Sequence, residues 1–194
     1  MGFWPNTLPV ACKEQPLAKI DPDKLDLQER VARTNKCQKT TKGGRTMSWS
    51  ALVVVGDGKG HVGVGLGKAR AIPDAIRKGM EAAKKSIIFI PIVAGTIPHE
   101  VLQHEGAAEI LIKPASAGTG IVAGSSMRII LELAGVHDVL GKSLGSANPV
   151  NIAWATIKAL KRLKRASEVA RLRGTTAESL TPWIRKTEEV AHAG

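Results

Sequence analysis

The amino-acid sequence predicts an α+β protein made of two small units. Three strand-like segments follow one another between about residue 33 and residue 68, and an amphipathic helix comes after them. Pro91 and Pro98 then mark a change of unit, beyond which strands and helices alternate. With 194 residues, the chain is long enough for two small domains that each bury a modest core.

Turn and glycine patterns define the strands of the first unit. The run from Trp49 to Val55 is strand-like, and a strong hairpin signal follows it at residues 57–60, Asp-Gly-Lys-Gly. Glycine favours such turns because it adopts the positive φ angles that they need. In the next strand, from His61 to Gly67, glycine occupies alternate positions. Glycines on one strand face predict either the close approach of another backbone or a bulge.

The helix of the first unit is predicted to begin at Ile72-Pro73-Asp74. Proline suits the first helical turn, and Asp74 faces the positive end of the helix dipole. The residues that we expect to cover the sheet recur at helical spacing: Ile72, Ile76, Met80, Ala83 and Ile87.

The second unit contains two predicted strands and two predicted helices. A strand over residues 108–113 leads through the loop Pro114–Gly120 to a helix over about 123–134, which Gly135 ends. Another strand is expected near residues 136–144. The pair Asn148-Pro149 is a good helix start because asparagine caps and proline fits the first turn, and this helix is predicted to run to about residue 163.

These patterns also suggest domain boundaries. The chain is expected to divide into a flexible N-terminal extension over 1–27, a first domain over 28–91, a second domain over 92–165 and a helical tail over 166–194.

Composition indicates the class of partner. The formal net charge is +11, from 28 Lys and Arg against 17 Asp and Glu, while 43% hydrophobic residues indicate a folded body. Nucleic acid is the favoured partner, and we expect no membrane association because no long apolar stretch exists. With two Phe, four Trp and no Tyr, the chain has few aromatic side chains on which single-stranded bases could stack, which favours structured RNA.

The cysteines and the first residues indicate the compartment. Cys12 and Cys37 have neither metal-site nor disulfide-framework spacing, and the first residues do not resemble a signal peptide, so a cytoplasmic protein is expected.

The basic residues concentrate in two places. Between Arg30 and Arg45 the chain has six basic residues and no acidic one, with a glycine pair beside Arg45. A cationic loop with flexible glycines, carried on a hairpin, is suited to holding a polyanion. A second group lies on one stripe of the last long helix, with Trp154 one turn ahead, either half-buried or at an interface. Its members in the predicted RNA-binding set are Lys158, Lys161 and Arg162.

Motifs for catalysis and metal binding are weak. Residues 58–63 match G-x-G-x-x-G, but a strand follows them where a dinucleotide site needs a helix. The Gly-rich segment 118–126 does precede a helix, so it fits a plain connection, a contact with RNA phosphate or protein, or the loop of a small-molecule kinase. His99 and His104 are five residues apart, which would point them in different directions on a helix. We therefore predict no enzyme activity, no metal and no cofactor.

Ordered motifs from about Val31 to Gly174 resemble one known family, that of bacterial protein five of the small ribosomal subunit. The matching segments are Lys39-Thr40-Thr41-Lys42-Gly43-Gly44-Arg45, Ala51–Gly60, Val62–Ala69, Pro114–Gly120, Leu133–Leu140 and Gly145–Asn151. The resemblance implies a double-stranded-RNA-binding-like first domain, with three strands and a helix, and a family-specific α/β second domain related to that of sugar- and mevalonate-type kinases.

The same resemblance implies a structural role in the ribosome. The family binds small-subunit ribosomal RNA at the junction of head and body, contacts proteins four and eight, lies near the channel where mRNA enters, and supports translational accuracy. The RNA-binding residues expected here are Lys36, Lys39, Thr40, Thr41, Lys42, Gly43, Gly44, Arg45, Lys59, Lys68, Arg70, Lys158, Lys161 and Arg162. The residues expected at the interface with protein four are Gly118, Thr119, Gly120, Gly124 and Arg128.

Some positions depart from the family pattern. Lys36 stands where the family usually has arginine, which keeps the charge but loses the bidentate geometry of a guanidinium. Trp154 also stands where arginine is common, and Ser125-Ser126 replace a Gly-Ala pair.

Overall fold

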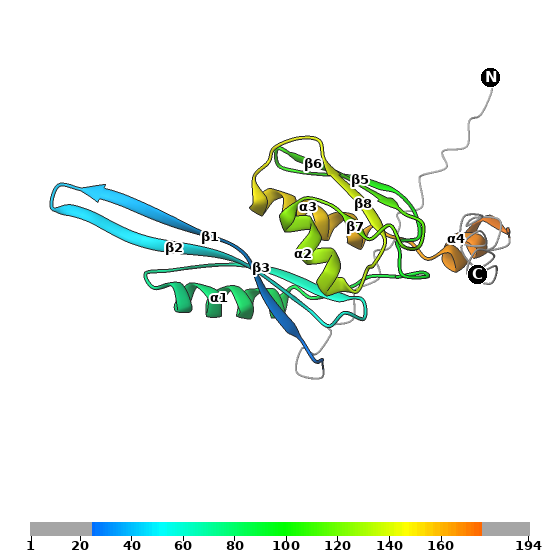
Figure 1. Ribbon diagram of the computed structural model, residues 1–194, viewed down its shortest axis with the longest axis horizontal. Coiled ribbons are helices and arrows are strands. Elements are labelled where there is room, and N and C mark those ends of the chain that lie inside the picture. The colour runs from blue at the N-terminus through cyan, green and yellow to red at the C-terminus, as the bar shows by residue number, and fades with distance from the viewer. Residues whose placement is uncertain (1–24, 176–194) are drawn as a thin grey trace, which may run out of the picture.

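A computed structural model describes residues 25–175 of the chain (Figure 1). Most of the predicted extension over 1–27 and most of the predicted tail over 166–194 therefore lie outside the described residues. Between residues 25 and 175, none of the helices combines the length and the apolar character that crossing a bilayer requires.

The first unit is an antiparallel sheet with one helix on it, as predicted. Its strands are β1 (Gln28–Thr41), β2 (Gly44–Gly56) and β3 (His61–Ala69), and the two-residue strand β4 (Ile88–Phe89) pairs with the start of β3. Helix α1 (Ile72–Lys85) packs against β2 and β3.

The glycines of β3 bring its backbone against that of α1. A Cβ atom at Gly65 would lie 2.1 Å from the carbonyl oxygen of Gly79, and one at Gly67 would lie 1.9 Å from that of Ala75. Of the two alternatives that the glycine pattern left open, the close approach of another backbone is therefore the one observed.

This close approach corrects part of the predicted face of α1, in which Ala83 is buried as expected but Ile72 is not. The fully buried residues of the helix are small, namely Ala75, Gly79 and Ala83, whereas Ile72 is 39% exposed. Only small side chains fit between two backbones that lie so close together, so Ile76 and Met80 pack at the side of the contact, partly buried.

The second unit is a four-stranded sheet with two helices on one face. Its strands are β5 (Val101–Glu105), β6 (Ala108–Pro114), β7 (Ile121–Val122) and β8 (Val139–Ser143), in the order β5-β6-β8-β7, with only β7 and β8 parallel among these pairs. The helices are α2 (Ser125–Ala134) and α3 (Pro149–Lys161), and a further helix, α4 (Ala166–Arg173), follows α3.

Strand β8 begins later than predicted, because the end of α2 uses the intervening residues. Gly135 adopts a left-handed φ of 85°, and the Val136 N–H returns to the Leu131 carbonyl at 3.0 Å. Together with the bond from the Gly135 N–H to the Glu132 carbonyl at 3.0 Å, this bond forms a helix C-cap, so residues 136–138 are not part of the strand.

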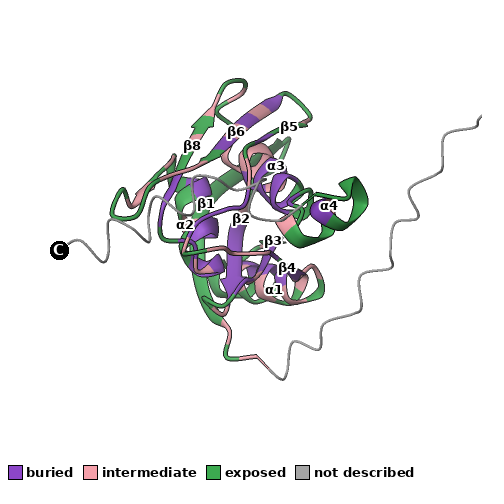
Figure 2. Ribbon diagram, turned by 90° about the vertical axis from the view of Figure 1, so that its right-hand side faces the viewer, coloured by how far each residue is buried: buried purple, intermediate pink, exposed green. Residues whose placement is uncertain are grey.

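The two units share one hydrophobic core. Figure 2 shows the buried residues gathered in β2, β3 and the helices that lie between the two sheets. Leu52, Val54 and Val64, from the first sheet, belong to the same cluster as Ile130 of α2 and Leu160 of α3. A smaller cluster, which includes Val53, Val55 and Ala83, lies on the other face of the first sheet under α1.

Backbone hydrogen bonds also join the two units. The Gly58 and Gly60 N–H groups, in the β2–β3 turn, donate to the carbonyls of Leu133 and Ala134 at the end of α2, each at 2.9 Å. A Cβ atom at Gly135 would lie 2.0 Å from the Gly58 carbonyl oxygen. The two predicted domains are therefore fixed against each other. Each was expected to bury a core of its own, but most of the buried residues belong to one core that the two units share.

Candidate nucleic-acid interface

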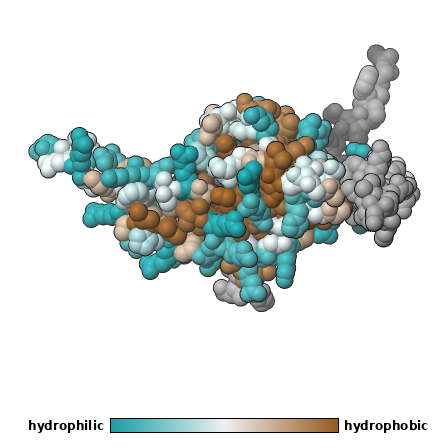
Figure 3. All heavy atoms as spheres, in the orientation of Figure 1, coloured by the Kyte–Doolittle hydropathy of each residue, from teal (hydrophilic) through white to brown (hydrophobic). Residues whose placement is uncertain are grey.

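Strands β1 and β2 continue beyond the body of the protein as a two-stranded ribbon (Figure 1). Strand β3 ends where Ala69 lies opposite Trp49, so the ribbon beyond this point has no third strand. Its outer part pairs Lys36 with Trp49 and continues to the pair Thr41 and Gly44. In Figure 3 the projecting ribbon is mostly hydrophilic.

The alternation of strand residues divides the cations of the ribbon between two faces. The register aligns Thr40 with Arg45 and Lys39 with Thr46. Lys39 shares one face with Arg33, while Lys36 and Arg45 lie on the other face. The ribbon therefore presents positive charge in two opposite directions.

These cations are not neutralised by neighbouring carboxylates of residues 25–175. Nearer the body, Arg30 Nη1 forms an ion pair with Glu132 Oε2 at 2.7 Å. Beyond it, no carboxylate in the described part of the chain lies within ion-pair distance of the basic ribbon residues, which are Arg33, Lys36, Lys39, Lys42 and Arg45. Such an uncompensated group of charges attracts polyanions.

Trp49 anchors the ribbon where it leaves the body. Its indole is partly buried and packs against the small cluster under α1 that includes Val53, Val55 and Ala83. Lys36 Nζ lies 5.9 Å from the centroid of the Trp49 ring, in a cation–π contact. The pair Lys36 and Trp49 therefore lies at the border between the small core under α1 and the cationic ribbon.

The two glycines at the tip have different roles. Gly44 adopts a φ of 139°, which side chains disfavour, and its carbonyl accepts a hydrogen bond from Thr41 Oγ1 at 3.1 Å. Gly43 is not in this φ region, and a Cβ atom there would meet nothing within 4 Å. The fold of residues 25–175 therefore does not require glycine at position 43.

Lys68 and Arg70 lie near the base of the ribbon. Lys68 is exposed in β3, opposite Ser50, and its side chain shares the face of Arg33 and Lys39. Arg70 is exposed directly after the strand. Arg33 was not among the predicted RNA-binding residues, although its place in the run of cations was a signal for it.

Lys59, by contrast, is not part of the ribbon surface. It lies in the β2–β3 turn, and the 13 residues of β2 separate this turn from Lys42. At about 3.3 Å for each residue, the two ends of β2 are roughly 40 Å apart. Lys59 and the ribbon tip therefore cannot hold the same phosphate.

Asp57 fixes the conformation of the turn that carries Lys59. Its Oδ1 accepts hydrogen bonds from the backbone N–H groups of Lys59 at 2.7 Å and His61 at 3.0 Å, and its Oδ2 lies 2.6 Å from His61 Nδ1. Burial raises the pKa of this carboxyl, but those hydrogen bonds and the His61 charge together hold the pKa below its ordinary value.

The predicted basic group on the last long helix is separate from the ribbon as well. Lys158 forms an ion pair with Glu105, and Arg162 Nη1 donates to Gln103 Oε1 at 2.7 Å. These contacts attach α3 to the edge strand β5. Lys161 is exposed and has no carboxylate within ion-pair distance among the described residues. Trp154 is partly buried.

The predicted protein-interface residues form an exposed loop before α2. Gly118 and Gly120 have φ angles of 86° and 72°, and a Cβ atom at either would meet nothing within 4 Å. Buried Asp138 holds the loop by accepting the Gly120 N–H at 2.8 Å. Thr119 Oγ1 donates to the Ser116 carbonyl at 2.8 Å.

Gly124 is the N-cap residue of α2, with an extended backbone and no side-chain capping bond, and Arg128 is exposed on the helix. The loop and the start of α2 thus offer a surface of exposed backbone and one guanidinium.

The two histidines of the weak metal motif do not share a helix. His99 precedes β5 and His104 lies within it. Over residues 25–175, no group of three or more His, Cys, Asp or Glu side chains could hold a metal ion.

Two family models match the chain. The model described as ribosomal protein S5, N-terminal domain, matches residues 27–91, and the model described as ribosomal protein S5, C-terminal domain, matches residues 103–173. The first match covers the ribbon sheet and α1, and the second covers most of the second sheet together with α2, α3 and α4.

Proposed function

Because the chain belongs to the ribosomal protein S5 family, a structural and non-enzymatic family of the small ribosomal subunit that binds ribosomal RNA, we propose that the β1–β2 ribbon is its main RNA-binding element. The observation that carries this proposal is the group of cations on both faces of a projecting ribbon, without a compensating carboxylate among residues 25–175.

The chemistry of the ribbon fits the RNA backbone. Side chains of arginine and lysine neutralise phosphates and fix the position of a protein on a nucleic acid, without reading sequence. The residues to which we assign phosphate contacts are Lys36, Lys39, Lys42, Arg45, Lys68 and Arg70. Thr40 adds a hydroxyl donor, whereas the Thr41 hydroxyl donates to the Gly44 carbonyl and holds the tip in shape. Gly43 and Gly44 allow the backbone to approach the RNA. Lys59, Lys158, Lys161 and Arg162 would contact RNA at other places on the molecule.

We also propose where the protein sits in the subunit. The ribbon would bind at the junction of head and body, and the exposed loop from Gly118 to Gly120, with Gly124 and Arg128, would contact protein four. Protein eight and the channel where mRNA enters would be further neighbours. This arrangement would give the protein an influence on translational accuracy, through contacts and not through catalysis.

Measuring the affinity for small-subunit ribosomal RNA as a function of salt tests the role of the ribbon. The variant Lys42→Gln/Arg45→Gln removes two cations that have no carboxylate partner among the described residues. We expect the slope of log affinity against log salt to become less steep by up to about 1.4–1.8, since each phosphate contact contributes about 0.7–0.9.

The matched control is Lys142→Gln/Arg171→Gln, which makes the same change in net charge at exposed residues of β8 and α4. This control is expected to keep the wild-type slope. An unchanged slope in the ribbon variant would contradict the proposal. Co-sedimentation of each variant with small subunits checks whether weaker RNA binding also weakens assembly.

A further inference from the structure

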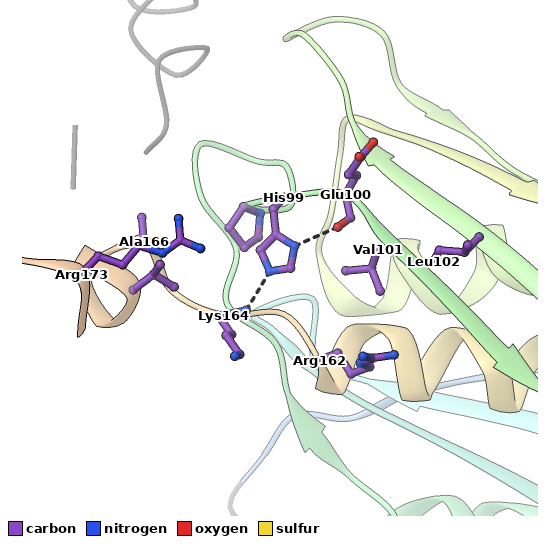
Figure 4. A pocket seen from close by; sticks show the side chains of 10 residues that line it. His99, Glu100, Val101, Leu102, Arg162, Lys164, Ala166 and Arg173 are labelled. Atoms are coloured by element: carbon purple, nitrogen blue, oxygen red, sulfur yellow. Dashed lines mark hydrogen bonds between the residues drawn. The ribbon is translucent and has the colours of Figure 1, made fainter. Parts of the chain in front are cut away.

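A pocket lies between the start of β5, the end of α3 and α4 (Figure 4). Helix α4 is at the opposite end of the molecule from the ribbon tip (Figure 1). Its volume is about 490 Å³. The residues that line it are Pro98, His99, Glu100, Val101, Leu102, Arg162, Lys164, Ala166, Val169 and Arg173.

His99 holds two walls of this pocket together. Its Nε2 accepts the backbone N–H of Lys164 at 3.1 Å, and its Nδ1 lies 2.9 Å from the carbonyl oxygen of Glu100 (Figure 4). A ring with its proton on Nδ1 satisfies both contacts. The segment between α3 and α4 is thereby fastened to the segment before β5, so the pocket is formed without a ligand.

The charges around the pocket are mainly positive. Arg162, Lys164 and Arg173 line it from three successive parts of the chain, and Arg173 extends from α4 toward His99 (Figure 4). The only lining carboxylate, that of Glu100, turns away and pairs with Lys113 Nζ at 3.2 Å. Lys164 and Arg173 have no carboxylate within ion-pair distance among residues 25–175. The pocket therefore has an unbalanced positive charge.

The remaining walls are apolar. Pro98, Val101, Ala166 and Val169 supply aliphatic surface beside the cations. A volume near 490 Å³ lies within the range of about 300–1,000 Å³ that is usual for small-ligand sites, and it exceeds what a bare phosphate needs. A phosphodiester in an RNA chain offers one negative charge for the cations, and the C–H edges of its riboses and the faces of the attached bases can pack against the aliphatic side chains.

We propose that this pocket binds a phosphodiester of the small-subunit ribosomal RNA. The proposal rests on the proposed function, because a chain that binds ribosomal RNA has phosphodiester groups of that RNA close to its surface. Ribosomal RNA would then be held at both ends of the long axis of the protein, by the ribbon at one end and by the pocket at the other. Two linked contacts raise the overall affinity more than either does alone.

The variant Lys164→Gln/Arg173→Gln tests the proposal in the full chain. It removes two lining cations but keeps the backbone N–H of residue 164, so the bond to His99 remains. We expect the salt slope for small-subunit ribosomal RNA to fall by about 0.7–0.9, the contribution of one phosphate. The affinity loss relative to wild type is then about threefold smaller at 200 mM than at 50 mM salt.

The control Lys142→Gln/Arg171→Gln makes the same change in net charge, and Arg171 lies in the same last turn of α4 as Arg173 without lining the pocket. A pocket variant with the wild-type slope overturns the proposal. The ribbon variant decides separately whether the proposed function fails, since its cations lie at the other end of the molecule.

A second measurement distinguishes ribosomal RNA from a free phosphate compound. The wild-type protein is titrated with inorganic phosphate and with adenosine monophosphate, while the NMR signal of the Lys164 amide is followed. Saturable binding of either compound, together with an unchanged RNA slope in the pocket variant, overturns the assignment to ribosomal RNA. Competition between adenosine monophosphate and ribosomal RNA that is lost in the pocket variant supports it.

Discussion

The substitution Gly65→Ala tests the contact between β3 and α1. The new Cβ atom would lie 2.1 Å from the Gly79 carbonyl oxygen and 2.4 Å from the Ala83 nitrogen, whereas ordinary contact begins near 3.4 Å. Both atoms belong to the helix backbone, so no side chain can rotate away. Helix α1 would have to move from the sheet by about 1.3 Å, which opens the small core beneath it.

The expected cost is at the upper end of the range for overpacking, about 3 kcal/mol of unfolding free energy. That is a large share of the roughly 5–15 kcal/mol that stabilises a typical domain. For a chain of this size it corresponds to a fall in Tm of about 6–12 °C. Urea and thermal unfolding followed by circular dichroism measure both quantities.

Gly43→Ala is the matched control, because a Cβ atom at position 43 meets nothing within 4 Å. Its unfolding free energy is expected to stay within about 0.5 kcal/mol of wild type. A loss below about 1 kcal/mol for Gly65→Ala would refute the reasoning, since it would mean that helix and sheet separate easily.

Two further predictions concern stability. Asp57→Ala removes three hydrogen bonds from a side chain that is 5% exposed, and we expect it to cost about 2 kcal/mol near neutral pH. Because the native pKa of Asp57 is lowered, its stabilisation is present above the ordinary carboxyl pKa and is lost as the pH falls through the lowered value, so wild type and variant are expected to converge in acid urea titrations. A difference that persists or grows in acid would contradict this. Asn148→Ala removes the side-chain cap of α3, whose Oδ1 accepts the Val150 N–H at 3.2 Å, and is expected to cost about 1 kcal/mol, while Asn148→Asp retains the cap. Equal losses in the two variants, measured by urea unfolding, would exclude a capping role.

Local patterns predicted most of the elements of the fold. The turn at residues 57–60, the helix starts at Pro73 and Pro149, and the glycine signal in β3 all depend on the dihedral preferences of neighbouring residues. Strands β4 and β7 were missed because two residues carry no periodicity. The five-residue strand β5 was missed as well.

The face of α1 could not be read from hydrophobic spacing alone. Periodicity counts large apolar residues, such as Ile72, as the buried ones. The structure instead buries Ala75 and Gly79, because glycines in β3 let the two backbones meet. The sequence contains both the glycines of β3 and the small residues of α1. Only the contact between the strand and the helix shows that these small residues are the buried ones.

By itself, the sequence determined that this protein is basic, that its cations cluster between Arg30 and Arg45, and that this cluster lies on a hairpin. These properties depend on composition and on residues close together in the chain. Only the tertiary structure decided which cations remain available, since Arg30 meets Glu132 and Lys158 meets Glu105 across long separations. It also decided that the two units share a core, because burial depends on which segments the folded chain brings together.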